Sequence, residues 1–459
     1  MLPEGFLKRI KSQKYIDSEL LTRSLDEPSP VSIRLNRMKW QKQPERSEKV
    51  PWTSDAYYLD ARPSFTLDPL FHAGSYYPQE ASSMFLEQFI LRYAGSADRI
   101  KVLDLCGAPG GKSTHLATLL GTNGFLVSNE VIVQRANVLS ETLTKWGTGN
   151  FIVTQNDPAD FRELPGYFDV IVVDAPCSGE GMFRTEIART EWSEANAAHC
   201  SERQKRILQD IWPALKENGL LIYSTCTFNP SENEENVSWL VKNNNAVSAE
   251  VDVSSFSGIE EIDYHGIKGY GFHPGKIRGE GFFIAAVIKK ETTGFTKQAS
   301  LKGDNSRPGK HETEALKKYF DIDDKRLLKW NDLLLSLPCD TDDYRMLKQR
   351  LRIVKHGTRL ASLMKNDLVP EHDVALSHLI KPGSFPLTEL GYDDAVAFLR
   401  RDILKPDVKE KGWNIVTYKN VPLGWIKNIG ARINNYYPVE WRIRMQKSNA
   451  SDAGIIKWE

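Results

Sequence analysis

The chain has 459 residues, with 60 Lys and Arg against 60 Asp and Glu, so its net charge alone indicates neither a nucleic-acid nor an acidic partner. The length suggests about three domains, and no apolar run approaches the roughly 20 residues that span a bilayer. The segment from Met1 to Lys14 is charged throughout and lacks the apolar core of a secretory signal. Five scattered cysteines without metal-type spacing predict a reduced, cytoplasmic protein with no metal site.

Residues 1–90 are predicted to form a small mixed α+β domain. An amphipathic helical beginning precedes a strand at Val31–Asn36, whose alternation is expected to turn Arg34 and Asn36 outward. Aromatic residues then follow, and we expect most of them to pack in the domain core: Trp52, Tyr57, Tyr58, Phe65, Phe71, Tyr76 and Tyr77. A helix is expected to begin near Ser82 and to continue through Leu91.

From residue 99 apolar strands alternate with amphipathic helices, a pattern typical of a parallel α/β sheet. The strands are predicted at Lys101–Leu105, Phe125–Glu130, Phe151–Thr154, Phe168–Asp174, Gly219–Ser224 and Phe282–Ile288. The helices are predicted at Lys112–Leu120, Ile132–Trp146 and about Ser193–Leu215. Acidic or small polar residues (Glu130, Asp157, Asp174 and Ser224) stand where these strands end. In a doubly wound sheet they would converge on one ligand.

A glycine-rich turn follows the first of these strands, at residues 103–113, and a helix follows the turn. Such a turn brings backbone N–H groups together around a ligand. A phosphate-binding P-loop requires glycine five positions before Gly111, where Cys106 stands, and the dinucleotide pattern is also absent. The turn is therefore predicted to bind a ligand other than these phosphates.

The C-terminal part is less regular. Residues 291–310 have few apolar side chains and are predicted to be a linker. Beyond them, residues 411–447 interleave basic with aromatic side chains. This composition suits an RNA surface, and it also suits a solvated positive face beside an ordinary aromatic core.

Two cysteines stand directly after predicted strands. Cys177 lies in Asp174-Ala-Pro-Cys-Ser-Gly179, and Cys226 lies in Ser224-Thr-Cys226. Both are followed by hydroxyl residues at strand ends, which indicates nucleophilic chemistry, whereas Cys106, Cys200 and Cys339 are interpreted as small buried residues.

These two boxes and the turn at Cys106–Ser113 resemble the Nol/Nop/Sun family of RNA 5-methylcytosine methyltransferases, in particular its bacterial small-subunit ribosomal RNA enzymes. Further resemblance lies in Tyr77–Met84, Gly279–Phe283 and Val421–Trp425. It covers nearly the whole chain and is strongest from about 75 to 288. It implies an RNA-binding role for the domain at 1–90 and a Rossmann-like class I methyltransferase domain at 91–290. It also implies C-terminal RNA-binding domains of ferredoxin-like or PUA-like fold, namely a small α+β domain at 311–378 and a PUA-like domain at 379–459.

The resemblance also implies S-adenosylmethionine as the cofactor. Its expected binding residues are Cys106, Gly107, Ala108, Pro109, Gly110, Gly111, Lys112, Glu130, Arg135, Asp157 and Asp174. Glu130 would hold the ribose hydroxyls, and Asp157 would meet the adenine edge. From the residues alone, both acids are equally suited to cap turns or helices.

The expected reaction is methylation of carbon 5 of cytosine through a covalent cysteine adduct. By resemblance Cys226 adds to the base and Cys177 serves product release, although Cys177 is the nucleophile in the DNA enzymes. Asp174 and Lys112 are candidates to contact the base, and Ser113 is expected to cap a helix. Arg184 is expected to bind an RNA phosphate. His115 and His273 have no expected role in catalysis.

The expected partner is 16S ribosomal RNA or the small ribosomal subunit, bound by a monomer without membrane contact. Two other classes remain open: a catalytically silent RNA-binding assembly factor, and a DNA cytosine-5 methyltransferase.

Overall fold

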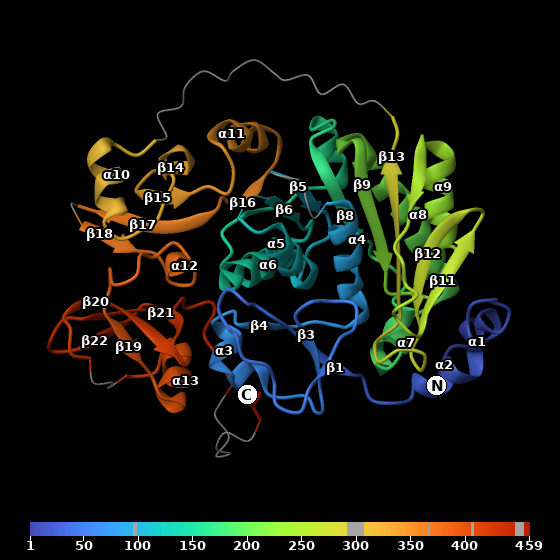
Figure 1. The fold of residues 1–459 in the computed structure, drawn as a ribbon, viewed down its shortest axis with the longest axis horizontal. Helices are drawn as coiled ribbons and strands as arrows, with labels where there is room; N and C mark the ends of the chain where they lie inside the picture. The colour runs from blue at the N-terminus through green and yellow to red at the C-terminus, as the bar shows by residue number, and fades with distance from the viewer. Residues whose placement is uncertain (95–98, 123, 292–306, 366, 405–407, 446–453) are drawn as a thin grey trace.

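The computed structural model of the chain describes residues 1–94, 99–122, 124–291, 307–365, 367–404, 408–445 and 454–459. Four β-sheets follow one another along the sequence (Figure 1). One has ten strands, and the other three have four strands each. The predicted mixed α/β class is confirmed. Within the described ranges, no helix combines the length and apolar character needed to cross a membrane.

The N-terminal part has two short helices before a sheet of order β2-β3-β1-β4. The helices are α1 (Glu4–Ile10) and α2 (Ser18–Ser24), and a third, α3 (Pro69–His72), lies before the last strand. The strands are β1 (Val31–Leu35), β2 (Glu48–Lys49), β3 (Ala56–Leu59) and β4 (Tyr76–Pro78). Asp17 caps α2 by accepting a hydrogen bond from the Leu20 amide at 3.0 Å. The aromatic side chains are mostly buried, as predicted.

The polar residues of β1 are buried, so the expectation that they face outward is wrong. Arg34 is 2% exposed and Asn36 is fully buried. The Arg34 guanidinium lies 4.4 Å from the Trp146 ring and donates to Thr114 Oγ1 at 2.6 Å. The central domain therefore covers the polar face of this strand. Alternation distinguishes two faces of a strand but does not reveal that both are covered.

The central sheet has the order β11-β12-β13-β9-β8-β5-β6-β7-β16, and β10 pairs with β13. Strands β5 (Lys101–Asp104), β6 (Phe125–Asn129), β7 (Phe151–Thr154), β8 (Phe168–Asp174) and β9 (Leu215–Thr225) are parallel. Antiparallel pairing extends this core through β10 (Ala246–Ala249), β11 (Ile259–Tyr264), β12 (Ile267–Phe272) and β13 (Phe282–Lys289). The sequence patterns did not predict β10, β11 or β12, and β9 begins earlier than expected.

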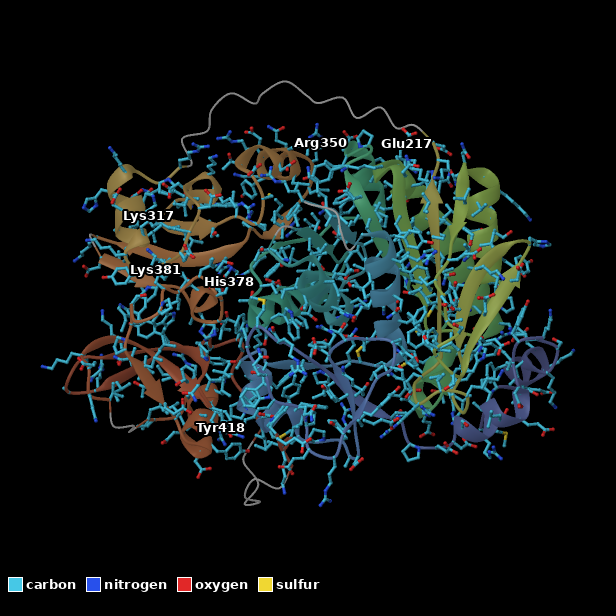
Figure 2. The ribbon with its side chains drawn as sticks, in the orientation of Figure 1. Glu217, Lys317, Arg350, His378, Lys381 and Tyr418 are labelled. Carbon is cyan, nitrogen blue, oxygen red and sulfur yellow. The ribbon has the colours of Figure 1, made fainter. Side chains whose placement is uncertain are left out.

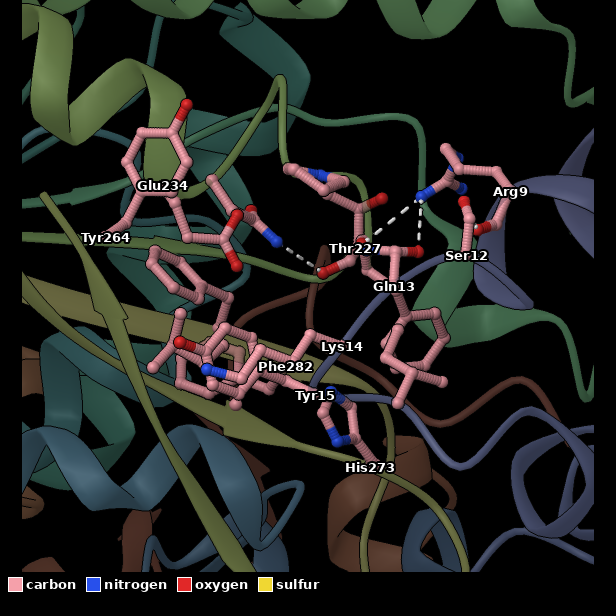
Figure 3. Close-up of a pocket in the computed structure, with 17 residues that line it drawn as sticks. Arg9, Ser12, Gln13, Lys14, Tyr15, Thr227, Glu234, Tyr264, His273 and Phe282 are labelled. Carbon is pink, nitrogen blue, oxygen red and sulfur yellow. Dashed lines mark hydrogen bonds between the residues drawn. The ribbon is translucent and has the colours of Figure 1, made fainter.

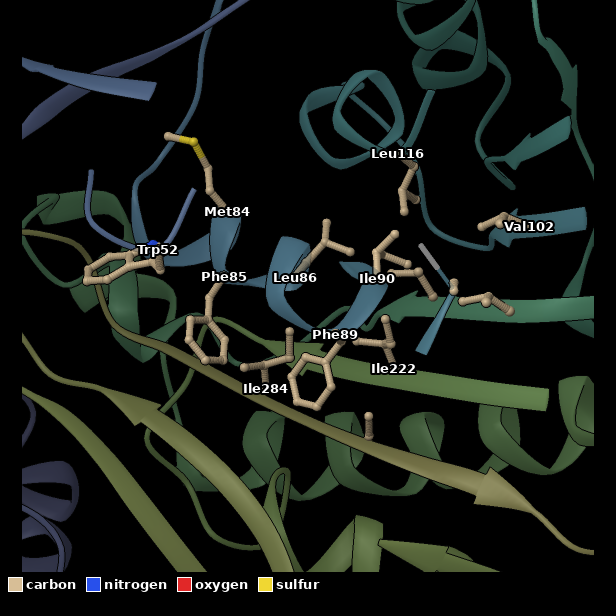
Figure 4. Close-up of a cluster of buried hydrophobic side chains, with 14 of the residues drawn as sticks. Trp52, Met84, Phe85, Leu86, Phe89, Ile90, Val102, Leu116, Ile222 and Ile284 are labelled. Carbon is tan, nitrogen blue, oxygen red and sulfur yellow. The ribbon is translucent and has the colours of Figure 1, made fainter. Parts of the chain in front are cut away.

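Helices cover both faces of the sheet. On one face α4 (Leu86–Tyr93), α5 (Gly111–Leu120) and α6 (Val133–Trp146) pack over alternate strand residues such as Val102 and Ile222 (Figure 4). On the other face α8 (Glu194–Ile211), α9 (Glu234–Asn243) and α11 (Thr341–Arg350) pack over the intervening residues, including Leu103 and Leu221. The short α7 (Glu186–Glu191) precedes α8. Burial on both faces explains why the strands are continuously apolar.

Two four-stranded sheets make up the C-terminal part. The first has the order β14-β15-β17-β18, with strands at Leu327–Trp330, Leu333–Ser336, Thr358–Met364 and Asp367–Pro370; α10 (Lys310–Lys317) precedes it and α12 (His372–Ala375) follows it. The second contains β19 (Leu387–Glu389), β20 (Gly412–Tyr418), β21 (Val421–Asn428) and β22 (Ile433–Asn435), with α13 (Tyr392–Arg400) between β19 and β20. Lys381 Nζ donates to the Lys317 carbonyl at 2.5 Å, which joins the loop before the second sheet to α10 (Figure 2).

Segments of the C-terminal part return to the earlier domains. Strand β16 (Ile353–Lys355) pairs antiparallel with β7 and so adds a strand to the central sheet. The chain end also reaches the N-terminal part, where the Trp458 ring lies 5.4 Å from the Trp40 ring. Most of the expected linker, residues 292–306, lies outside the described residues.

Candidate active site

The turn between β5 and α5 is tightly packed. A Cβ atom on Gly107 would lie 2.4 Å from Ser128 Oγ and 2.7 Å from Ser113 Oγ, too close for any side chain. Gly110 has a φ of +120°, a conformation that favours glycine. The turn thus requires glycine at position 107 because of the close approach and favours it at position 110 because of the positive φ.

Behind the turn, Ser113 holds the end of β5. Its hydroxyl donates to Asp104 Oδ2 at 2.6 Å, so Ser113 is not the expected helix cap, a position that Gly110 occupies. Burial raises the pKa of Asp104 to about 7. Its second oxygen, Oδ1, has no hydrogen-bond partner within the described part of the chain.

A cavity of about 230 Å³ opens at the carboxyl ends of the parallel strands. It is lined by Leu105, Cys106, Ala108, Asn129, Glu130, Val131, Ile132, Arg135, Asp157, Pro158, Asp174, Ala175, Pro176, Cys177, Arg203, Arg206, Ile207 and Cys226. Gly107, Pro109, Gly110, Gly111 and Lys112, which were also predicted to bind the cofactor, do not line it. The cavity nevertheless gathers the three acids that the sequence places at the ends of three separate strands, Glu130, Asp157 and Asp174.

Glu130 stands at the end of β6 beside two exposed apolar side chains. Its Oε1 accepts from the Ile132 amide at 3.0 Å, and Arg135 approaches its Oε2 at 3.5 Å. Arg135 also donates to the Ala108 carbonyl at 2.9 Å. This arginine therefore ties the glycine turn to Glu130, while Val131 and Ile132 remain 41% and 44% exposed.

Asp157 both lines the cavity and caps a short 3-10 helix. Its Oδ1 accepts from the Ala159 amide at 3.1 Å, in a capping box with Asp160. Arg206 lies 4.0 Å from its Oδ2. Helix capping and cofactor binding by Asp157 are thus compatible. Capping uses Oδ1, whereas Oδ2 lies toward Arg206, which also lines the cavity.

The two thiols at the strand ends lie together. Cys177 Sγ and Cys226 Sγ are 3.0 Å apart, and the Cys226 amide donates to Cys177 Sγ at 3.3 Å. The contact with Cys226, together with burial, raises the pKa of Cys177 well above its usual value. Cys177 therefore keeps its proton at neutral pH.

Lys112 and Asp174 form an ion pair beside the thiols, with 2.9 Å between Nζ and Oδ2. Ser224 donates to the other oxygen of Asp174 at 2.7 Å. Burial opposes the charge of Lys112, but the attraction of Asp174 outweighs burial and raises the pKa of Lys112 above its ordinary value. A smaller electrostatic attraction to Cys226 acts in the same direction. A permanent ammonium group thus stands close to Cys226.

A buried polar network holds the Cys177 loop. Glu232 accepts from the Ser178 amide at 2.9 Å and from Gln204 at 3.1 Å, and Gln204 also donates to the Pro176 carbonyl at 3.0 Å. No sequence pattern points to Glu232 or Gln204, because they come from separate segments and belong to no motif. The same is true of Arg203 and Arg206, which enter the cavity from α8.

Three further residues considered in the sequence, Arg184, His115 and His273, have side chains buried within the fold and do not line the strand-end cavity. Arg184 is only 6% exposed in its side chain, pairs with Glu280 at 3.1 Å and donates to the Ser24 carbonyl, which contradicts the expected RNA phosphate contact. His115 contacts Glu87 at 2.8 Å, and burial lowers the pKa of His115 to about 4, so this contact is a hydrogen bond at neutral pH. His273 is buried outside the cavity at the strand ends.

Comparison with known proteins gives matches to three family models. Residues 94–288 match 16S rRNA methyltransferase RsmB/F, residues 2–81 match the N-terminal domain of 16S rRNA methyltransferase RsmF, and residues 385–443 match the methyltransferase RsmF PUA domain. Ribosomal RNA small subunit methyltransferase F of Shewanella loihica is 30% identical over 445 residues, covering 90% of this chain and 89% of that protein. The chain belongs to the RsmF methyltransferase family.

Solved structures agree with this family membership. A methyltransferase homolog from Pyrococcus horikoshii is 26% identical, with a TM-score of 0.51 over 63% of this chain and 100% of that one. NSun6 from the same organism, solved with the S-adenosylmethionine analogue SFG, has a TM-score of 0.52 at 20% identity and covers 63% of this chain and 98% of its own. The predicted Rossmann-like methyltransferase fold with N-terminal and PUA domains is confirmed, and the RsmF family is S-adenosylmethionine-dependent.

Proposed function

We propose that the chain transfers a methyl group from S-adenosylmethionine to carbon 5 of a cytosine in 16S ribosomal RNA, either as free RNA or in the small subunit. The observation that carries this proposal is the pair of thiols, 3.0 Å apart, at the edge of the strand-end cavity and beside the Lys112–Asp174 ion pair. An RNA-binding factor without catalysis would have no use for this arrangement.

The cavity suits S-adenosylmethionine in its chemistry. Carboxylates such as Glu130 accept hydrogen bonds from ribose hydroxyls, and Asp157 would accept from the amino edge of adenine. The exposed side chains of Val131 and Ile132 offer an apolar surface for the flat base. Asp174, at the thiol end of the cavity, would stand nearest the sulfonium. When bound, S-adenosylmethionine supplies the methyl group that carbon 5 takes up.

Cys226 is the proposed nucleophile. Carbon 5 of cytosine is a weak nucleophile until a thiolate adds to carbon 6 and makes carbon 5 electron-rich. The charge of Lys112, which interacts with Cys226, supports this assignment, since a nearby cation favours the thiolate form of a cysteine. The Lys112 ammonium would stabilise negative charge that develops on the base during addition.

Cys177 and Asp174 have proposed roles around that adduct. The oxygens of Asp174 can accept from the amino group of the base, which orients the ring above Cys226. Cys177 can give its proton to the Cys226 sulfur as that sulfur leaves carbon 6, and can take up the proton that carbon 5 loses, because the two sulfur atoms are already in contact. This contact supports a role for Cys177 in releasing the methylated product.

The C-terminal part is proposed to hold RNA that flanks the target. A cavity of about 630 Å³ lies between its two sheets, and its lining includes Lys318, Tyr319, Phe385, Trp413, Lys427 and Tyr436. Lys427 Nζ lies 5.1 Å from the Trp413 ring, and Tyr436 is 40% exposed. Aromatic rings beside lysines suit unpaired RNA, whereas Trp425 and Tyr437 of the same stretch are buried in the core. We further propose that the protein acts as a monomer.

We also propose the domain division at 1–90, 91–290, 311–378 and 379–459, with a linker at 291–310. Separate sheets within these ranges support it, and β16 is the one named strand of the described residues that pairs with the sheet of another range.

Methyl transfer from labelled cofactor to RNA lacking the modification tests the proposed function. Cys226→Ala should abolish transfer, and Cys177→Ala should accumulate a covalent protein–RNA adduct that resists denaturing electrophoresis. Cys200→Ala is the control, since Cys200 does not line the cavity. Duplex DNA serves as the competing substrate. An adduct with Cys226→Ala would reverse the two roles, and transfer to DNA alone would refute the RNA assignment.

A further inference from the structure

A second cavity, of about 350 Å³, lies on the other side of the Cys226 loop (Figure 3). Its lining comes from three places: the segment after α1, the loop that follows Cys226, and the hairpin of β11 and β12 with the start of β13. It shares no lining residue with the cavity at the strand ends, but Cys226 lines one and the next residue, Thr227, lines the other. Its volume lies within the range of about 300–1,000 Å³ that is typical of small-ligand sites.

The walls of this cavity are aromatic. Tyr15, Phe228, Tyr264, Phe282 and Phe283 line it, and the imidazole of His273 lies against Phe228 with 5.7 Å between ring centres. Such flat apolar walls suit a planar ring, as the stacking of unpaired bases on aromatic side chains illustrates.

Two polar groups of the lining lack partners. One carboxylate oxygen of Glu234, at the first position of α9, is buried and has no hydrogen-bond partner within the described ranges, and the same holds for Nδ1 of His273. Burial raises the pKa of Glu234 to about 7 and lowers that of His273 to about 4. Buried groups without partners are costly, so their place beside an apolar cavity indicates a ligand that supplies the missing hydrogen bonds.

Cations stand at the rim. Lys14 is exposed, and its ammonium group lies 5.0 Å from the Tyr15 ring. Arg9, which pairs with Glu180 and donates to the Phe228 carbonyl at 3.3 Å, fixes the neighbouring wall. Figure 3 shows Arg9 and Ser12 on one side of the cavity and Glu234 with Tyr264 on the other. A ligand that carries both a flat polar ring and a phosphate matches this arrangement.

Phe282 connects this cavity to the catalytic residues. Its ring lines the cavity and also lies 5.1 Å from Lys112 Nζ, which pairs with Asp174. A nucleotide bound here would therefore be close to a cytosine placed over Cys226.

We infer that this cavity binds the base of an unpaired RNA nucleotide next to the methylated cytosine, and that Glu234 selects a base with an exocyclic amino group. Adenine, cytosine and guanine can donate to the carboxylate through such a group, and uracil cannot. This inference rests on the proposed function, because it assumes RNA at Cys226.

Binding of short synthetic single-stranded RNA with one central cytosine tests the inference without methyl transfer. In matched RNAs each neighbouring base is in turn removed or replaced by uracil, and affinity is measured by fluorescence anisotropy at constant salt. For the wild-type protein, one neighbouring position should lower the affinity about tenfold when it is abasic or uracil. Glu234→Gln, whose amide can turn either its oxygen or its NH2 group to the base, should no longer distinguish uracil from the unmodified RNA at that position.

Glu235→Gln is the matched control, because Glu235 is the next residue of α9, is exposed and does not line the cavity. The inference is overturned if Glu235→Gln behaves like Glu234→Gln, if no single position matters, or if the wild-type protein does not bind these RNAs. Methyl transfer to total ribosomal RNA, measured in parallel, tests the proposed function separately. Transfer to ribosomal RNA, combined with equal binding of all the synthetic RNAs, would refute the cavity inference alone.

Discussion

Replacement of Gly107 by alanine tests whether the turn after β5 has to approach the serines behind it so closely. A Cβ atom here would lie 2.4 Å from Ser128 Oγ and 2.7 Å from Ser113 Oγ. These hydroxyls contact each other at 2.7 Å, and Ser113 donates to Asp104 at 2.6 Å. Neither hydroxyl can move away without disturbing a buried hydrogen bond.

The expected effect of Gly107→Ala follows from those contacts. Overpacking costs about 1–3 kcal/mol, and a disturbed buried hydrogen bond adds about 1 kcal/mol. We expect the free energy of unfolding to fall by about 2–4 kcal/mol in total. If the turn moves to relieve the clash, part of this loss appears instead as weaker S-adenosylmethionine binding. If all of the roughly 2–4 kcal/mol appeared in binding, the affinity for S-adenosylmethionine would fall by roughly 30- to 700-fold.

Urea unfolding and calorimetric titration with S-adenosylmethionine measure the two contributions. Gly391→Ala is the matched control, since a Cβ there meets nothing within 4 Å and its φ of −66° suits alanine. Ser128→Ala removes the nearest oxygen, so combining it with Gly107→Ala should recover part of the loss. A Gly107→Ala protein that matches wild type in both measurements would refute the close-packing argument.

Three further predictions concern Lys112, His115 and the aromatic and basic side chains of the C-terminal cavity. Lys112→Met should lower kcat for methyl transfer more than tenfold, since a donor that acts in the transition state is lost, and single-turnover assays measure this; an unchanged kcat would exclude that role. Because the folded pKa of His115 is about 4 against 6.5 when unfolded, stability should fall by up to about 3 kcal/mol from pH 6.5 to 4; urea unfolding across this range should show a shallower slope for His115→Gln. Lys427→Ala and Tyr436→Ala should each weaken RNA binding with cofactor affinity unchanged, and titrations with both ligands check this.

The central sheet could be predicted from the sequence because its strands are buried on both faces. Short, continuous apolar runs rich in β-branched residues, such as Val170–Val173, are typical of strands that are buried on both faces. Strands β10 and β11 were missed because their residues are buried and exposed without a regular alternation. Strand β12 is mostly buried, but Lys268 and two glycines interrupt its apolar residues. Strand β16 could not be found, since it joins β7 across some 200 residues of sequence and has only three residues of its own.

The candidate site was predictable to the extent that strand ends define it. Cys177 and Cys226 follow β8 and β9, which are adjacent parallel strands, so their loops had to meet. The supporting residues follow no such rule. Glu232 and Arg184 are fixed by partners far away in the sequence, and no local pattern records those contacts. For the same reason a basic residue in a motif-rich loop looked like an RNA ligand and is instead a buried ion-pair partner.

The turn Gly110-Gly-Lys-Ser113 also explains how a segment that resembles a phosphate loop serves a different chemistry. In a phosphate loop the lysine reaches the phosphates of the nucleotide. Here Asp174 holds the Lys112 ammonium at 2.9 Å, and Phe282 lies on another side at 5.1 Å, so its charge is directed to the edge where Cys226 stands. A lysine held in this way by Asp174 is poorly placed for a phosphate, and in the proposed mechanism it would stabilise the base during addition. Loss of Asp174 should therefore free the lysine as well as remove a hydrogen-bond acceptor, and Asp174→Asn should impair methyl transfer at least as strongly as Lys112→Met.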